Sequence, residues 1–155
     1  MLHAYRLVKL IEIHSDGLAR SLHERYRNDK KCSAYVNVPE SELTAKVYEV
    51  YRHLVEWLLG KTEADVERRY LAIGAERAGQ GVPASQVVWM ICLVRENLWD
   101  YLQKHAELEK PAEIFGEVEL LEMLDQFINR AVYYAALGHE RASHGYQVFQ
   151  EPVTA

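Results

Sequence analysis

The sequence predicts a single all-α domain of about five helices, arranged either like a globin or as a simple helical bundle, with a long C-terminal αα-hairpin. Apolar residues recur at spacings of three and four along most of the 155-residue chain, which is the period of one helix face. Glycine and proline separate these periodic segments, and helices usually end at such residues. We assign residues 1–150 to the domain and residues 151–155 to a tail or a truncated linker.

The first two predicted helices rest on this period. One helix runs from about residue 2 to residue 27, and residues 28–39, which lack a helical period and end at Pro39, form a loop with an extended piece over 34–38. A second helix covers about residues 40–59, and Gly60 stops it, as glycine does just beyond a helix. The apolar face of the first helix consists of Leu7, Ile11, His14, Leu18, Leu22 and Tyr26.

The last three helices are marked by their ends. Thr62 and Asp65 have the spacing of a capping box, so a third helix should follow them and run to about residue 78. Gly79, Gly81 and Pro83 break the chain, and a fourth helix covers about 84–105. A fifth helix starts with proline at 111 and runs to about 144. The connection of about five residues predicts antiparallel neighbours.

These last two helices are apolar over more than one face. A helix that is apolar nearly all round is buried on two sides, and five helices of this size leave little room for two central ones. We therefore predict a homodimer in which two hairpins form an intermolecular four-helix bundle. The alternative is that the first three helices wrap the hairpin within one chain. The expected interface row on the fifth helix is Val118, Leu121, Ile128, Val132 and Ala135.

Composition limits the cellular setting. Hydrophobic residues make up 49% of the chain, and the net charge is −5. This composition argues against a disordered chain and against a nucleic-acid-binding protein, which usually carries a basic face. The two cysteines form no CxxC motif, and neither a signal peptide nor an apolar run of membrane-spanning length is present in the sequence. We expect a cytoplasmic protein without nucleic-acid or membrane partners.

No catalytic or metal-binding motif is recognisable. His139 and His144 lie five residues apart, whereas an HExxH zinc motif needs four. Glu-x-x-His, GxSxG and phosphate-binding glycine patterns are also missing from the sequence. Cys32 follows a basic run that could lower the pKa of its thiol, although a free thiol without a role is the favoured interpretation. We predict no enzyme activity, no metal and no cofactor.

Aromatic and polar residues suggest two further hypotheses. The tryptophans could line an apolar pocket for a small molecule or a tetrapyrrole, although aromatic residues at helical spacing are more often plain core. Arg95 lies in an apolar helix and needs an acceptor, for which Glu76 is the expected partner. A small helical enzyme would require both residues and His139 to converge in one cleft. The candidate ligand-binding residues are Trp57, Trp89, Arg95, Trp99 and His139.

Three motifs resemble one known family. They are the helix break ERAGQGVP at 76–83, an Arg-Glu-x-x-Trp sequence at 95–99 and an Arg-Ala-x-Tyr-Tyr sequence at 130–134. Over about residues 40–142 the chain resembles the N-terminal sensor domains of the RsbR and RsbRD type, the RsbT co-antagonists of bacterial stress signalling. The resemblance implies a sensory role, homodimerisation through the last two helices and a globin-like arrangement without haem.

The resemblance has two consequences for partners. The predicted helix over 63–78 contains no histidine that could act as the proximal ligand of a haem, so we expect no haem. Family members usually carry a C-terminal output domain such as STAS, so this chain is either a stand-alone member or a domain separated from its output. We therefore predict a non-enzymatic sensory or regulatory domain of bacterial signalling that acts as a homodimer on an effector protein, the alternative being a small-molecule-binding or tetrapyrrole-binding helical protein.

Overall fold

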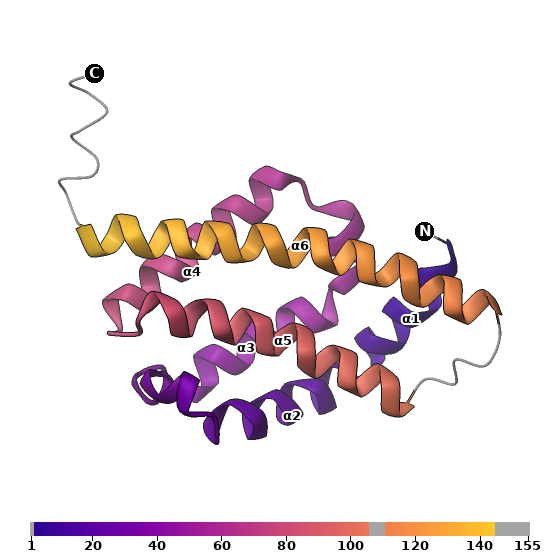
Figure 1. The fold of residues 1–155 in the computed structure, drawn as a ribbon, viewed down its shortest axis with the longest axis horizontal. Coiled ribbons are helices and arrows are strands. Elements are labelled where there is room, and N and C mark those ends of the chain that lie inside the picture. Colours follow the sequence, from indigo (N-terminus) through magenta and orange to yellow (C-terminus); the bar gives the residue numbers. More distant parts are fainter. Residues whose placement is uncertain (1, 106–110, 145–155) are drawn as a thin grey trace.

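The computed structural model describes residues 2–105 and 111–144, and all regular structure in these ranges is helical (Figure 1). The all-α prediction is confirmed, but eight helical elements take the place of about five. The predicted connection after residue 105 and the predicted tail lie outside the described residues. In chain order the elements are α1 (Leu2–Ile13), α2 (Ser15–Arg27), the 3₁₀ helix η1 (Lys30–Asn37), α3 (Glu40–Arg52), the π-helix η2 (Glu56–Gly60), α4 (Glu63–Gly79), α5 (Ala84–His105) and α6 (Pro111–His144).

Two predicted helices are each divided by a local break. The first is divided at His14, whose backbone (φ −97°, ψ 18°) leaves the helical region and separates α1 from α2. The second is interrupted at His53 (φ −117°, ψ 34°), directly after α3 ends at Arg52, and the chain is helical again before the π-turn of η2. Just after this interruption the Val55 N–H donates to Glu12 Oε2 of α1 at 3.0 Å. A carboxylate from a distant helix thus accepts a backbone hydrogen bond where the second helix is interrupted.

The prediction of a loop with an extended piece over 34–38 was wrong. Residues 30–37 form the 3₁₀ helix η1, which is kinked at Cys32 (φ −119°, ψ 18°). Asp29 caps it, because its Oδ1 accepts the Lys31 N–H at 2.9 Å. A 3₁₀ helix repeats every three residues and is used in short pieces, so a search for the α-helical period does not find it.

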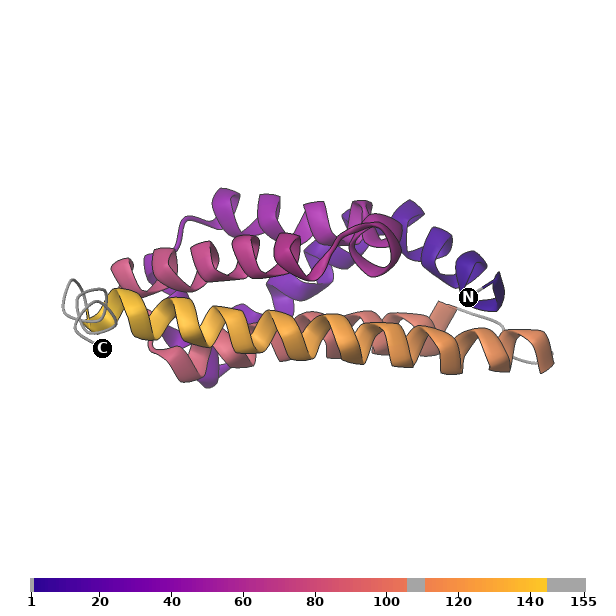
Figure 2. The same ribbon diagram turned by 90° about the horizontal axis from the view of Figure 1, so that it is seen from above.

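The helices form two layers. Figure 2 shows α5 and α6 along one side of the molecule, running in opposite directions, with α1, α3 and α4 on the other side. The predicted capping box at the start of α4 is confirmed, because Thr62 Oγ1 accepts the Asp65 N–H at 3.2 Å and Asp65 Oδ2 accepts the Thr62 N–H at 2.9 Å. None of the described helices is both long enough and apolar enough to cross a membrane.

The main partner of α6 is α4, with further contacts to α1 and α5. The two helices approach closely because glycine faces backbone on both sides. A Cβ atom added to Gly74 would meet the Ala135 carbonyl, and one added to Gly138 would meet the Leu71 carbonyl. Ala131 and Ala135 are fully buried in the same contact. The missing Cβ atoms at Gly74 and Gly138 therefore allow the short distance between these helices.

Candidate functional site

The motif at 76–83 forms the corner between α4 and α5. Gly81 has a φ of 77°, in the left-handed region where glycine is favoured. The N–H groups of Gln80 and Val82 both donate to the carbonyl oxygen of Arg77, at 3.1 and 3.0 Å. The glycine and these bonds explain why the chain can turn so tightly after α4.

Arg77 is the buried charge of this corner, with 1% of its surface exposed. Its Nη1 donates to Glu42 Oε1 of α3 at 2.8 Å and to Gln80 Oε1 at 2.9 Å. The hydrogen bond from Arg77 is the main reason why the pKa of the Glu42 carboxyl lies below its usual value. Arg77 therefore joins the corner to α3, a link that sequence reasoning missed because the two residues come from different helices.

The prediction that Arg95 pairs with Glu76 was wrong. Arg95 of α5 forms its ion pair with Asp125 of α6, whereas Glu76 lies 4.0 Å from Lys46 Nζ. The third residue of the enzyme hypothesis, His139, forms a hydrogen bond between Nε2 and the Val82 carbonyl oxygen at 2.6 Å. Val82 precedes Arg95 by 13 residues along the chain, about 20 Å if helical. The structure therefore does not bring these three side chains into one cleft.

The three tryptophans also lie apart. Trp57 packs against Phe127, with 5.8 Å between the ring centres. Trp89 Nε1 donates to Asp29 Oδ2 at 2.8 Å, beside η1. Trp99 lines a hollow of about 210 Å³ between α5 and α6. The predicted ligand-binding residues therefore do not form a single pocket. In the part of the chain that the structure describes, no three His, Cys, Asp or Glu side chains are grouped as metal ligands.

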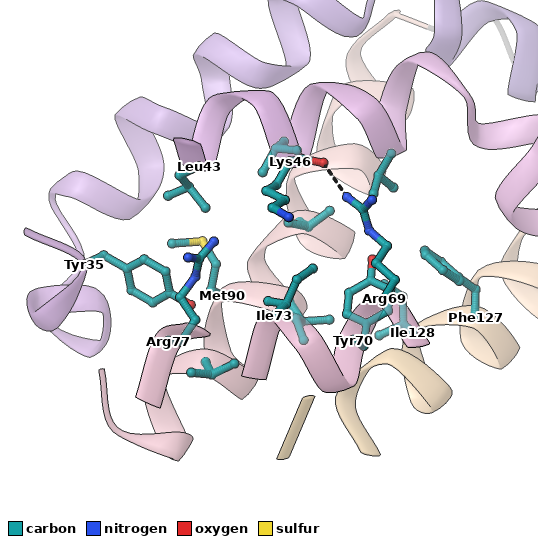
Figure 3. A pocket seen from close by; sticks show the side chains of 15 residues that line it. Tyr35, Leu43, Lys46, Arg69, Tyr70, Ile73, Arg77, Met90, Phe127 and Ile128 are labelled. Carbon is teal, nitrogen blue, oxygen red and sulfur yellow. Dashed lines mark hydrogen bonds between the residues drawn. The ribbon is translucent and has the colours of Figure 1, made fainter. Parts of the chain in front are cut away.

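A different cavity lies between α3, α4, α5 and α6 (Figure 3). Its volume is about 60 Å³ and its walls are mostly aliphatic and aromatic. Three cationic side chains, Lys46, Arg69 and Arg77, line the side formed by α3 and α4. The sequence did not point to this cavity, because its walls are ordinary core positions of four helices. They include Val50, Val87, Met90, Ile91, Phe127 and Ile128.

The outer face of α5 and α6 contains part of the predicted dimer row. Val118 is 51% exposed, and Leu121 and Val132 are partly buried. Ile128 and Ala135, in contrast, are buried in the core of their own chain. The structure thus divides this row between an outward part and a part that packs on the other helices. The ion pair of Arg95 and Asp125 also lies on this outer face, with both side chains partly exposed.

The thiol of Cys32 is buried within η1. Burial and, to a lesser degree, the negative charge of Asp29 raise the pKa of this thiol to about 12. The hypothesis that the preceding basic run activates Cys32 is therefore wrong. A thiol with a raised pKa is almost fully protonated near neutral pH and is a poor nucleophile.

Alkylation of Cys32 should therefore be slow in the folded protein. At pH 8 a thiol with the usual pKa of 9.0 is roughly one-tenth thiolate, whereas one with a pKa of about 12 is roughly one ten-thousandth thiolate. We expect iodoacetamide to label Cys32 about 1000-fold more slowly in native protein than in urea, measured by mass spectrometry of the peptide. Equal rates in the two states would contradict the burial of this thiol.

Comparison with known proteins gives one match. A family model described as the RsbT co-antagonist protein rsbRD N-terminal domain matches residues 16–147. No curated protein and no solved structure matches the chain. The matched range includes the corner at 76–83 and every described helix from α3 to α6.

Proposed function

The chain belongs to the RsbRD N-terminal domain family, and from this premise we propose that it is a sensory or regulatory domain of bacterial signalling that acts as a homodimer. It works in the cytoplasm, catalyses no reaction and transmits its state to an effector protein. A signal acts by favouring one of two arrangements of the helices, which requires a ligand or partner with different affinity for each. The helices that would transmit this change are α5 and α6.

The observation that carries the dimer is the outer face of the layer formed by α5 and α6. Figure 2 shows α1, α3 and α4 on the opposite side of this layer. The outer face still carries apolar side chains, with Val118 half exposed and Trp99 and Leu121 partly covered. Apolar surface of this kind is typical of an interface, and a second copy of the same layer would bury it as a four-helix bundle.

The ion pair between Arg95 and Asp125 fits the same proposal. It joins α5 to α6 on the outer face, and its side chains are 41% and 50% exposed. Charged groups at an interface contribute more to orientation and specificity than to affinity. In a symmetric dimer the pair would fix how the two layers align, while the neighbouring apolar side chains supply most of the stability.

Val118→Glu tests this arrangement. We expect the wild-type protein to have the mass of a dimer in size-exclusion chromatography with light scattering. A glutamate buried at the interface would be costly because its charge loses water, so the variant should dissociate at least 100-fold more readily. Val36→Glu is the matched control, because Val36 is 86% exposed and lies on η1, not on α5 or α6.

The two variants separate the possible results. A wild-type protein that is monomeric at all accessible concentrations contradicts the homodimer. A dimer that is weakened equally by both glutamates, or by Val36→Glu alone, places the interface on another face. Dissociation caused by Val118→Glu alone supports the interface formed by α5 and α6.

A further inference from the structure

We propose that the cavity between α3, α4, α5 and α6 binds a small organic anion, namely a monocarboxylate with a short apolar chain. This inference rests on the proposed function in one respect, because it takes this anion to be the signal of the sensory domain. The carboxylate would lie against the cationic side formed by α3 and α4, and the chain would point toward α5 and α6 (Figure 3).

The charges around the cavity favour an anion. Among the described residues that line the cavity, none carries a carboxylate, whereas three carry a positive charge: Lys46, Arg69 and Arg77. Their side chains are 34%, 13% and 2% exposed. The acidic partners of these cations are more open to solvent, with side-chain exposures of 45%, 49% and 33% for Glu76, Glu49 and Glu42. Water screens the exposed carboxylates more strongly than the buried cations, so we expect the cations to dominate the charge felt inside the cavity.

Arg69 offers a hydrogen bond that the protein leaves unused. Its Nη1 donates to Glu49 Oε2 at 2.9 Å, and its Nη2 donates to the Lys46 carbonyl oxygen at 3.1 Å. Its Nε is buried and has no acceptor. A buried donor without an acceptor is unfavourable, and an oxygen of a carboxylate that displaced the side chains covering Nε would satisfy it. The guanidinium is also held in place, since it lies 4.9 Å from the centre of the Trp57 ring.

The size and walls of the cavity select the apolar part of the ligand. A volume of about 60 Å³ is roughly the share of two water molecules in the liquid. The other walls are apolar and include Val94, Phe127 and Ile128. A carboxylate with a chain of roughly two to three carbons is larger than this volume, so the side chains of the walls must move apart to admit it. Acetate is too short to use these walls, and octanoate is too long for the cavity.

Binding at this place would connect the ligand to the proposed dimer layer. Arg69 and Arg77 belong to α4, whereas Val94 belongs to α5 and Ile128 to α6. An occupied cavity therefore favours the arrangement in which α4 lies close to the layer of α5 and α6. A ligand with this preference shifts the population toward that arrangement.

Calorimetric titration of the full chain with sodium salts of acetate, propionate, butyrate and octanoate tests the proposal. We expect propionate and butyrate to bind saturably and at least tenfold more tightly than acetate or octanoate, and the neutral analogue butyramide not to bind. Saturable binding by butyramide, or a lack of saturable binding by any of the carboxylates, would overturn the proposal.

Variants of α4 locate the site. Arg69→Met should weaken butyrate binding at least tenfold, whereas Arg68→Met should leave it unchanged, because Arg68 is 76% exposed and does not line the cavity. Ile73→Phe, which fills the cavity from its wall, should also abolish binding. Equal affinities for the two methionine variants would overturn the site. If Arg69→Met does not fold, as judged by circular dichroism, Ile73→Phe and the chain-length series decide the question.

Light scattering on the same samples separates this proposal from the dimer. Butyrate binding to a protein that remains monomeric supports the anion site and contradicts the homodimer. A dimer that binds none of the carboxylates contradicts the anion site and leaves the proposed dimer standing.

Discussion

Replacing Gly138 by alanine is expected to destabilise the fold by about 3 kcal/mol, although alanine is the better helix former. The added Cβ would lie 2.8 Å from both the Cα and the carbonyl carbon of Leu71. These are backbone atoms of α4, so no side-chain rotation can relieve the overlap. The two helices must separate, and the contact that buries Ala131 and Ala135 completely would be lost. The same reasoning applies to Gly74→Ala, whose Cβ would meet the backbone of Ala135.

Urea denaturation followed by circular dichroism measures this effect, and Gly17→Ala is its control. Gly17 also lies in a helix, α2, but a Cβ added there has no neighbouring atom within 4 Å. Its replacement should therefore be neutral or stabilise the fold by up to about 1 kcal/mol, since alanine restricts the unfolded chain. If Gly138→Ala were as stable as Gly17→Ala, the close crossing of α4 and α6 would be wrong.

The sequence predicts the second half of the fold well because the ends of these helices are local. The capping box of Thr62 and Asp65, the break around Gly81 and the proline at 111 each act within a few residues. The first half is less predictable because its breaks depend on distant contacts. The break at His53 is followed by Val55, whose N–H is bonded to Glu12, 43 residues away in the chain, and no local pattern reports such a bond.

The candidate sites show the same division. Helical spacing placed Val118, Ile128 and Ala135 in one row, but only packing reveals that the last two face the core of their own chain. Apolar spacing identifies the rows of α6 without indicating which partner each row meets, and this long helix meets several. The cavity was missed for a related reason. Arg69 and Arg77 are eight residues apart on α4 and read as surface charges until α3 and α5 enclose them.

Arg77→Met is expected to destabilise the protein by about 1–3 kcal/mol, the usual effect of removing a buried hydrogen-bonding partner. Methionine keeps most of the length of the side chain but supplies no donor for Glu42 and Gln80. The corner between α4 and α5 would then lose its link to α3. Arg68→Met is the control, because Arg68 is 76% exposed on the same helix and should change stability by less than about 0.5 kcal/mol. Similar urea midpoints for the two variants would show that the buried link is dispensable.

The same link should make stability depend on pH in the acidic range. Because the hydrogen bond from Arg77 lowers the pKa of Glu42 below its usual 4.5 in the folded protein, ionised Glu42 favours folding. This contribution is fully present above the usual pKa and is lost as the pH falls through the lowered folded pKa. Glu42→Gln removes the titrating group, so its urea midpoint should fall less than that of the wild type between about pH 6 and pH 3. An equal fall in both proteins would show that acid acts on the fold through other carboxylates and not through the contact between α3 and the corner.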